Sequence, residues 1–243
     1  MRSLPPHKVV IPMAGQSRRF QAAGYAAPKP FIPIDGKMMI ERVCRLFSAE
    51  DEFVFVCNEE QLQANPGCGR ALQAIAPRAQ VVAIAPHELG PVYTAIAADE
   101  YIGDDEAVII AYCDFSLRWS YRQFLLQAAQ YDGAMAVFRG FHPASFGDTD
   151  YCYLRVDENL ELLEVGEKRP FTAHRADEYA STGVYYFGAW RTFRHYAEEL
   201  VAQGQRVGGE YYASLIYPAM LRDGKRVCVQ EVEKFICWGT PQD

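Results

Sequence analysis

Five apolar segments in the first 140 residues lack the polar–apolar alternation of a half-exposed strand, which indicates strands that are covered on both faces. They lie at residues 8–12, 52–57, 80–85, 107–113 and 133–138. Between them, apolar residues recur at helical period in four segments, residues 39–48, 61–75, 93–100 and 121–131. Strands that alternate with helices in this way predict an α/β fold with a Rossmann-like, doubly wound and mostly parallel sheet.

The pattern changes after about residue 140. Residues 151–157 and 160–166 alternate on either side of Asp157-Glu158-Asn159, which predicts a hairpin. The other predicted elements are strands at 180–187 and 227–232 and helices at 190–203 and 211–222. Because no linker or repeat separates the two parts, we expect a single domain over residues 1–243, with a smaller mixed-sheet lobe at 141–243.

Composition and charge exclude several classes of protein. Half of the 243 residues are apolar, enough for a large core, and the formal net charge is −7. Non-specific binding to nucleic acid needs a basic field, so we expect no nucleic-acid partner. The seven cysteines form no CxxC pair and the five histidines no metal-binding spacing, which is typical of a reduced, cytoplasmic protein. No apolar run approaches the roughly twenty residues of a membrane span, and residues 1–8 lack a signal-peptide core.

The loop after the first predicted strand concentrates positive charge. Gly15, Arg18 and Arg19 follow that strand, and Lys29 comes next, between two prolines. Open α/β sheets bind ligands at the C-terminal ends of their strands, and backbone N–H groups with a nearby arginine and lysine suit a polyphosphate. The loop therefore predicts a nucleoside triphosphate site, although it is neither a Walker A nor a GxGxxG motif. The alternative is that the arginines begin a solvated helix and that the lysine is an ordinary surface residue.

These residues resemble the signature of the nucleotidyltransferases that activate phosphorylated small molecules, which include sugar-1-phosphate nucleotidylyltransferases and phosphocholine cytidylyltransferases. The family's pattern is roughly Gly-x-Gly-x-Arg-Phe, followed later by Pro-Lys-Pro. Here Gly15, Arg19, Phe20 and Pro28-Lys29-Pro30 match, and Ser17 stands at the usual second glycine. Further matches follow in the family's order: Asp114, Glu167-Lys168, residues 181–187, Gly209-Glu210 and Gly239-Thr240-Pro241.

The resemblance implies that residues 1–140 form a nucleotide-binding half. It assigns these residues to the nucleotide: Ala14, Gly15, Gln16, Ser17, Arg19, Lys29, Gly90 and Thr94. Arg19 would bind the β- and γ-phosphates and Lys29 the α-phosphate, both as catalytic residues. The glutamine that thymidylyltransferases place before the base-reading loop is Ala85 here, which leaves CTP or UTP. CTP is favoured because phosphocholine-type members share the opening motif.

Asp114 is the predicted catalytic metal ligand. It follows the apolar run 107–113, and a carboxylate at the end of a buried strand suits Mg²⁺, which takes a few carboxylates together with phosphates and water. The alternative is a helix N-cap or turn aspartate, since a predicted helix follows. Sugar nucleotidylyltransferases supply a second aspartate where Cys237 stands, and a thiol is a poor Mg²⁺ ligand. The metal would then be held by Asp114 and phosphates alone, Glu210 or Glu233 could replace the second aspartate, or turnover could be weak or absent.

The resemblance also implies that residues 141–243 form an acceptor-binding half, with these residues on the acceptor: Glu167, Lys168, Thr182, Gly183 and Glu210. On its own, the Glu-Lys pair would be taken as an exposed turn. Hexose-1-phosphate enzymes carry a glycine where Cys152 stands and an arginine where Gly208 stands. A sugar phosphate and a phosphorylated amine, polyol or amino acid therefore stay open. The tyrosines at 151, 153, 185, 186, 211 and 212 could cage a cationic group, or simply form core and wall.

Three functions fit these observations. The first is Mg²⁺-dependent transfer of a nucleoside monophosphate from a pyrimidine nucleoside triphosphate to the phosphorylated acceptor, with release of pyrophosphate. The second is a GT-A-type glycosyltransferase, although Tyr112-Cys113-Asp114 lacks the first aspartate of the Asp-x-Asp motif and Lys29 would be unexplained. The third is a non-catalytic nucleotide-binding homologue, which Cys237 favours. Relatives continue beyond Gly239-Thr240-Pro241, so we expect a short member or a fusion to a further domain, and a homo-oligomer stays open.

Overall fold

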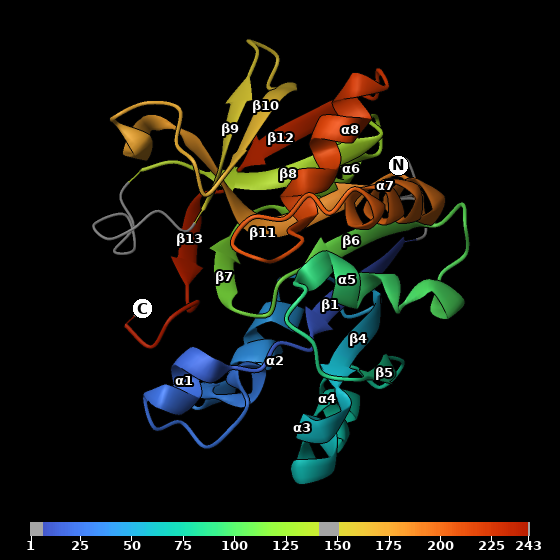
Figure 1. The fold of residues 1–243 in the computed structure, drawn as a ribbon, viewed down its shortest axis with the longest axis vertical. Helices are drawn as coiled ribbons and strands as arrows, with labels where there is room; N and C mark the ends of the chain where they lie inside the picture. Colours follow the sequence, from blue (N-terminus) through green and yellow to red (C-terminus); the bar gives the residue numbers. More distant parts are fainter. Residues whose placement is uncertain (1–6, 141–150, 243) are drawn as a thin grey trace.

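The computed structural model describes residues 7–140 and 151–242 (Figure 1). Its centre is a nine-stranded sheet in which four parallel strands stand in the order β6-β1-β4-β5. Their bounds are β1 (His7–Met13), β4 (Glu52–Asn58), β5 (Gln80–Ile84) and β6 (Ala107–Ala111). Because β1 pairs with β4 on one side and β6 on the other, the loop after β1 leaves from the middle of the parallel sheet.

The sheet continues into the second half of the chain through β11 (Tyr179–Phe187), which runs antiparallel to β6. On its other edge β11 pairs with β8 (Gly133–Phe138), and β8 carries β12 (Val227–Glu231) as a parallel neighbour. The hairpin of β9 (Cys152–Val156) and β10 (Leu162–Glu167) pairs with the first residues of β11. One sheet therefore runs through both halves.

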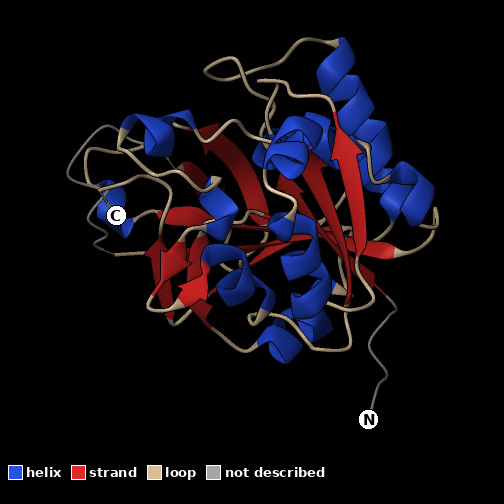
Figure 2. Cartoon of the chain, turned by 90° about the horizontal axis from the view of Figure 1, so that it is seen from below, coloured by secondary structure: helices blue, strands red, loops and turns tan. Residues whose placement is uncertain are grey.

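Helices cover both faces of this sheet (Figure 2). Val9 and Ile11 of β1 belong to one core cluster and Val10 to the other, and all three are fully buried. Burial on both faces explains why the strand is apolar without alternation. The first cluster is closed by α2 (Met39–Cys44), α4 (Gly67–Ile75) and α6 (Tyr121–Ala128). The second is closed by α5 (Pro91–Ile96), α7 (Trp190–Ala202) and α8 (Tyr217–Arg222).

The predicted α/β fold with a mostly parallel central sheet is confirmed, but two predicted helices are broken. In place of one helix at 61–75, α3 (Glu59–Ala64) ends before Asn65 and α4 begins after Pro66. Proline lacks an N–H and disfavours helical backbone in the residue before it, and Asn65 accordingly has φ −130° and ψ 72°. Within the predicted helix 211–222, a 3-10 turn, η5 (Ala213–Ile216), precedes α8, which has Pro218 in its first turn.

Two short sheets were not predicted. β2 (Pro33–Ile34) pairs with β3 (Lys37–Met38), and β7 (Phe115–Arg118) pairs with β13 (Lys234–Cys237). Asp114 is therefore followed by a strand, and the N-cap alternative for it is wrong. The pairing of Phe115 with Cys237 brings the C-terminal segment to the end of β6, next to Asp114.

The remaining short helical elements are α1 (Arg18–Ala22), η1 (Lys29–Phe31), η2 (Asp99–Tyr101) and η4 (Arg175–Asp177). Within residues 7–140 and 151–242, no helix has the length and apolar composition needed to cross a membrane.

Candidate active site

The loop after β1 is held in place from behind. Asn58, at the end of β4, donates from Nδ2 to the Ala14 carbonyl oxygen at 3.5 Å, and Gln61 of α3 donates from Nε2 to the Gly15 carbonyl oxygen at 3.1 Å. In a trans peptide the C=O and the following N–H point in opposite directions. The N–H groups of Gly15 and Gln16 therefore point away from β4 and α3, as donors to an anion would have to.

Ser17 ends this loop in an uncommon backbone conformation. Its φ of 57° and ψ of 24° lie in the left-handed region, which glycine adopts without strain. This backbone conformation explains why the Gly-x-Gly-x-Arg-Phe pattern has a glycine at the position of Ser17. The Ser17 hydroxyl accepts a hydrogen bond from the Lys29 backbone N–H at 3.0 Å, so the side chain ties the start of α1 to η1. The serine therefore supplies a contact that a glycine could not make.

Lys29 and Asp114 meet although 85 residues separate them in the chain. The Lys29 Nζ lies 2.5 Å from Asp114 Oδ2 and donates to the Gly239 carbonyl oxygen at 3.2 Å. It also lies 5.4 Å from the centre of the Phe20 ring. Burial lowers the pKa of Lys29, but the Asp114 carboxylate outweighs it and the pKa is raised, so the ammonium stays charged. The Asp114 carbonyl in turn accepts from the Trp238 N–H at 2.7 Å.

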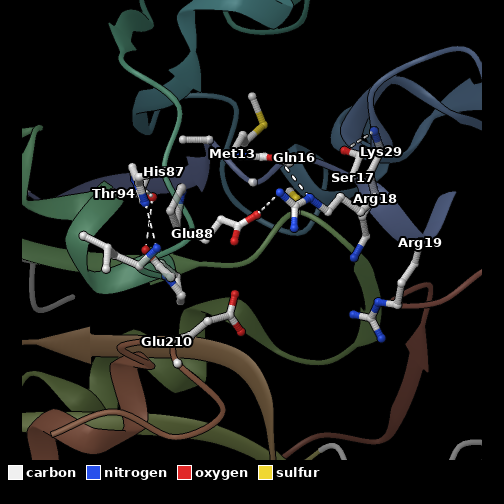
Figure 3. A pocket seen from close by; sticks show the side chains of 18 of the residues that line it. Met13, Gln16, Ser17, Arg18, Arg19, Lys29, His87, Glu88, Thr94 and Glu210 are labelled. Atoms are coloured by element: carbon white, nitrogen blue, oxygen red, sulfur yellow. Dashed lines mark hydrogen bonds and ion pairs between the residues drawn. The ribbon is translucent and has the colours of Figure 1, made fainter. Parts of the chain in front are cut away.

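Lys29, Phe20 and Gly239 line a cleft of about 640 Å³ at the C-terminal end of β1 (Figure 3). The predicted nucleotide-binding residues all line it: Ala14, Gly15, Gln16, Ser17, Arg19, Lys29, Gly90 and Thr94. Arg18 reaches across to an ion pair with Glu88, and Glu210 points into the cleft from the opposite wall (Figure 3). Arg19 is exposed and lines the same cleft. Arg19 and Lys29 thus line one cleft, and Asp114 contacts it through Lys29, while the predicted role of these three residues stays a prediction.

The loop between β5 and α5 forms a rigid side of the cleft. His87 Nδ1 accepts from the Leu89 N–H at 3.0 Å, which leaves Nε2–H to donate to the Thr94 hydroxyl at 3.1 Å. Burial lowers the pKa of His87, in agreement with this neutral form. Gly90 has φ 88°, and a Cβ on it would come within 2.8 Å of the Glu210 Cβ. A glycine is therefore required where this loop meets the opposite wall.

The predicted acceptor residues fall into two groups. Glu210 lines the cleft, and the Lys168 Nζ lies 3.6 Å from where a Cβ of Gly208, another lining residue, would be. The other three support the wall from behind. Thr182 is 3 % exposed and donates to the Ala136 carbonyl oxygen at 3.0 Å, and a Cβ on Gly183 would meet the Tyr112 ring at 3.1 Å.

Glu167 belongs to this supporting group because its carboxylate is already bonded inside the protein. It accepts from the Ser214 hydroxyl and interacts with the Cys152 thiol. Burial raises the pKa of Glu167, and these two hydrogen bonds oppose that rise. Its side chain therefore fixes β10 against η5, at the base of the wall that carries Glu210.

Among the described residues, Asp114 is the carboxylate that contacts Lys29. Within the described ranges, no three His, Cys, Asp or Glu side chains gather into a metal-binding group. Glu233 pairs with Arg118 at 3.5 Å, and it precedes Cys237 by a whole strand, so it cannot replace the missing ligand. The residues fit a Mg²⁺ ion that takes most of its ligands from bound phosphates, since such ions commonly use one or two carboxylates.

Glu88, His87 and Arg206 are among the residues that line the cleft without a role in the sequence analysis. Glu88 and His87 lie in the loop expected to read the base, but no signal marked their side chains. Arg206 lines the cleft from the segment after α7, two residues before Gly208, the position at which hexose-1-phosphate enzymes carry an arginine. The sequence did contain a signal for Arg206, since it is a basic residue close to the position of that arginine.

Comparison with solved structures places the fold among nucleotidyltransferases. A nucleoside-diphosphate-sugar pyrophosphorylase from Vibrio cholerae RC9 aligns with a TM-score of 0.78 and 21% identity, over 96% of both chains. The inositol-1-phosphate CTP transferase from T. maritima aligns with a TM-score of 0.72 and 15% identity, over 100% of this chain and 92% of that one. A Bacillus anthracis structure described as a putative glucose-1-phosphate thymidylyltransferase aligns with a TM-score of 0.71 and 16% identity, over 97% of this chain and 91% of that one.

No curated protein sequence matches the chain. The profile of the family described as MobA-like NTP transferase domain matches residues 9–181, which include the loop after β1, Lys29, Asp114 and the strand β11 as far as Ser181. The chain therefore belongs to the MobA-like NTP transferase family and is a nucleotidyltransferase.

Proposed function

We propose that the protein transfers a nucleoside monophosphate from a pyrimidine nucleoside triphosphate to a small phosphorylated acceptor and releases pyrophosphate. The observation that carries this proposal is the 2.5 Å contact between Lys29 and Asp114 at the cleft beside the loop 14–17. An ammonium and a carboxylate brought together from distant parts of the chain supply the two charges that phosphoryl transfer needs, one for phosphate oxygens and one for a metal ion.

The chain's own residues divide the triphosphate between them. The N–H groups of the loop 14–17 would bind phosphate oxygens, as donors that are fixed before the ligand arrives. Arg19 would hold the β- and γ-phosphates of the leaving pyrophosphate. Lys29 would exchange part of its contact with Asp114 for the α-phosphate, where negative charge builds up in the reaction. Lys29 therefore acts on the atom that is attacked, and Arg19 on the group that leaves.

The acceptor needs little chemical activation. A phosphomonoester has a second pKa near 6, so it is largely a dianion at neutral pH and can attack without a dedicated base. Catalysis then consists of holding two anionic groups in line and compensating their charge. Mg²⁺, held by Asp114 and by phosphate oxygens, would neutralise charge on the transferring phosphate. This division of labour agrees with the described lining of the cleft, in which four cations stand beside the carboxylates of Glu88 and Glu210 and Lys29 contacts Asp114.

The preference for CTP or UTP rests on two sequence features. Ala85 takes the place of the glutamine typical of thymidylyltransferases, and the opening motif is shared with phosphocholine-type members. The side chains of His87 and Thr94 are bonded to each other at 3.1 Å, so they stabilise the loop rather than offer free groups to a base. We therefore expect the base to be recognised through the backbone of the loop 14–17 and through Gln16.

Release of pyrophosphate tests the proposal. The purified protein is incubated with each of the four common ribonucleoside triphosphates and dTTP, with Mg²⁺, with and without a panel of phosphorylated acceptors. The proposal expects acceptor-dependent release that is fastest with CTP or UTP. A glycosyltransferase would instead consume a nucleotide sugar, and a non-catalytic homologue would show binding by thermal shift without release. Either result would refute the proposed transfer.

A further inference from the structure

Residues 232–239, the C-terminal strap, lead from β12 back to the cleft. In Figure 1, the strand β13 of this strap runs beside β7 towards α1 and α2. The strap is anchored on β8 before it reaches the cleft, because the Phe235 ring stacks on the Phe138 ring with 4.4 Å between their centres. Its last residue, Gly239, lines the cleft. The strap therefore joins a core strand to the wall of the cleft.

Two consecutive residues of the strap contact both members of the Lys29–Asp114 pair. The Trp238 N–H donates to the Asp114 carbonyl oxygen at 2.7 Å. The next residue, Gly239, accepts at its carbonyl oxygen from the Lys29 Nζ at 3.2 Å. Because these two contacts come from neighbouring positions of one backbone, the strap fixes where the ammonium stands relative to the strand end that carries the carboxylate.

The Trp238 side chain supports Lys29 from a second direction. It packs against a small core cluster of Phe20, Ile32 and Met39, which are each at most 5 % exposed. The centre of the Phe20 ring lies 5.4 Å from the Lys29 Nζ, and the Ile32 N–H donates to the Lys29 carbonyl oxygen at 3.1 Å. The cluster thus holds Lys29 both at the ring beside its ammonium and at its backbone.

The size of Trp238 matters because this cluster has little other cover. Among the described residues, the other partly buried side chains packed on it are those of Ala27 and Ile34, which are much smaller. Removal of a large ring leaves a void, and the neighbouring side chains relax into it. Any shift of the Phe20 ring or of η1 would move the Lys29 ammonium. A displacement of about 1 Å at a catalytic group can lower a rate about 100-fold.

We propose that Trp238 is a positioning residue for the transfer. Its N–H fixes Asp114 and its ring fixes the cluster behind Lys29, so that the ammonium and the carboxylate keep the spacing that the reaction needs. Trp238 does not itself line the cleft, and it therefore acts through Lys29 and Asp114 rather than on the substrates. This inference rests on the proposed nucleotidyl transfer, and it makes the C-terminal strap part of the catalytic arrangement.

The first test compares Trp238→Ala, Trp238→Leu and Trp238→Phe with the wild type. The measurements are pyrophosphate release with CTP, Mg²⁺ and the acceptor that gives the fastest release, and titration of metal-free CTP. In Trp238→Ala we expect kcat to fall at least about tenfold, because Lys29 is displaced from the transferring phosphate. Binding of metal-free CTP should weaken about fivefold, because the same ammonium loses part of its phosphate contact. Trp238→Phe keeps a ring on the cluster and should restore both values to within about threefold, with Trp238→Leu between the two.

A double variant separates positioning from general damage to the fold. If Trp238 acts through Lys29, Trp238→Ala should weaken CTP binding in the wild type but change it by less than about 1.5-fold in the Lys29→Ala background. Damage to the fold would weaken binding equally in both backgrounds, and urea unfolding reports the folded fraction of each variant. The matched control is Trp119→Phe, at a half-buried tryptophan that donates to the Leu46 carbonyl oxygen outside the cleft. It should leave kcat and CTP affinity within about twofold of the wild type.

The outcomes distinguish this inference from the proposed function. Wild-type kcat in Trp238→Ala, or an equal loss of CTP affinity with and without Lys29, would overturn the positioning role and leave nucleotidyl transfer standing. Failure of Trp238→Phe to restore activity while it stays folded would also overturn that role. If the wild type releases no pyrophosphate with any triphosphate and acceptor, both proposals fall.

Discussion

Replacing either member of the Lys29–Asp114 pair should remove activity and leave the fold intact, but the two replacements should change nucleotide binding in opposite directions. Lys29→Ala removes a cation from the predicted α-phosphate site. Asp114→Ala removes a negative charge that repels phosphate, and it frees the Lys29 ammonium, which is now held at 2.5 Å. Without metal, the triphosphate should therefore bind more weakly to the first variant and more tightly to the second.

The magnitudes follow from the distance and the burial. At 2.5 Å, two unit charges in an effective dielectric of about 20 attract by about 6–7 kcal/mol. The side chains of Lys29 and Asp114 are only 16% and 23% exposed, so desolvation cancels most of that attraction and leaves a coupling of about 1–3 kcal/mol. Each variant should thus lose about 1–3 kcal/mol of stability, less than the 5–15 kcal/mol typical of a folded domain, and should stay folded.

Three measurements check this reasoning: pyrophosphate release, urea unfolding, and titration of the metal-free triphosphate. We expect turnover to fall at least about 100-fold in both variants, the usual effect of removing a preorganised charge. Nucleotide affinity should rise about tenfold in Asp114→Ala, because the freed ammonium gains a charged contact. Lys37→Ala, in β3 and outside the cleft, is the control. Turnover like that of the wild type in either variant, or a parallel loss of affinity in both, would refute the assigned roles.

Three further changes probe the loops around the cleft. Ser17→Ala should be about 1 kcal/mol less stable than Ser17→Gly by urea unfolding, because both lose the bond to Lys29 but only the alanine keeps the strained φ of 57°. Gly90→Ala should lower stability by about 2 kcal/mol or more and weaken nucleotide binding, since its Cβ would come within 2.8 Å of Glu210. Burial lowers the pKa of His87, so the folded protein favours the neutral ring. The contribution of this neutral ring to stability is complete above pH 6.5, the ordinary pKa of histidine, and it is lost as the pH falls from there through the lowered pKa. The melting temperature of the wild type should therefore fall more steeply below pH 6.5 than that of His87→Gln.

The fold was predictable where burial dictates the sequence. β1, β4 and β6 are covered on both faces, so their apolar runs have no competing explanation, and the alternation with helices then sets the parallel order. The short strands β7 and β13 have no such apolar pattern in their sequence. β7 has only four residues, and it is a strand because β13 arrives from more than 110 residues further along the chain to pair with it. That partner cannot be read from local sequence.

The site was predictable to the extent that motifs mark backbone positions. The cleft contains the residues expected from the loop after β1, and Asp114 meets Lys29 as the strand ends suggested. The wall on the other side was less predictable. The resemblance placed Gly183 on the acceptor, yet a Cβ at this position would meet the ring of Tyr112. Sequence shows that space is needed at a glycine, but only the packed structure shows what fills it.

Cys237 can now be judged by the charge balance around it. The N–H of Gly239 donates to its Sγ at 3.3 Å, while Asp114 and Lys29 form a pair with no net charge. A second carboxylate here would give the centre a net negative charge, and repulsion between the acids would favour a bound cation. With cysteine, the centre is balanced without metal, so metal affinity must come mainly from the triphosphate. We therefore expect Mg²⁺ alone to show no saturable binding below about millimolar concentration by calorimetry, since such ions need phosphates to complete their ligands. Cys237→Asp should bind it measurably more tightly, and equal affinity in the two proteins would refute the argument.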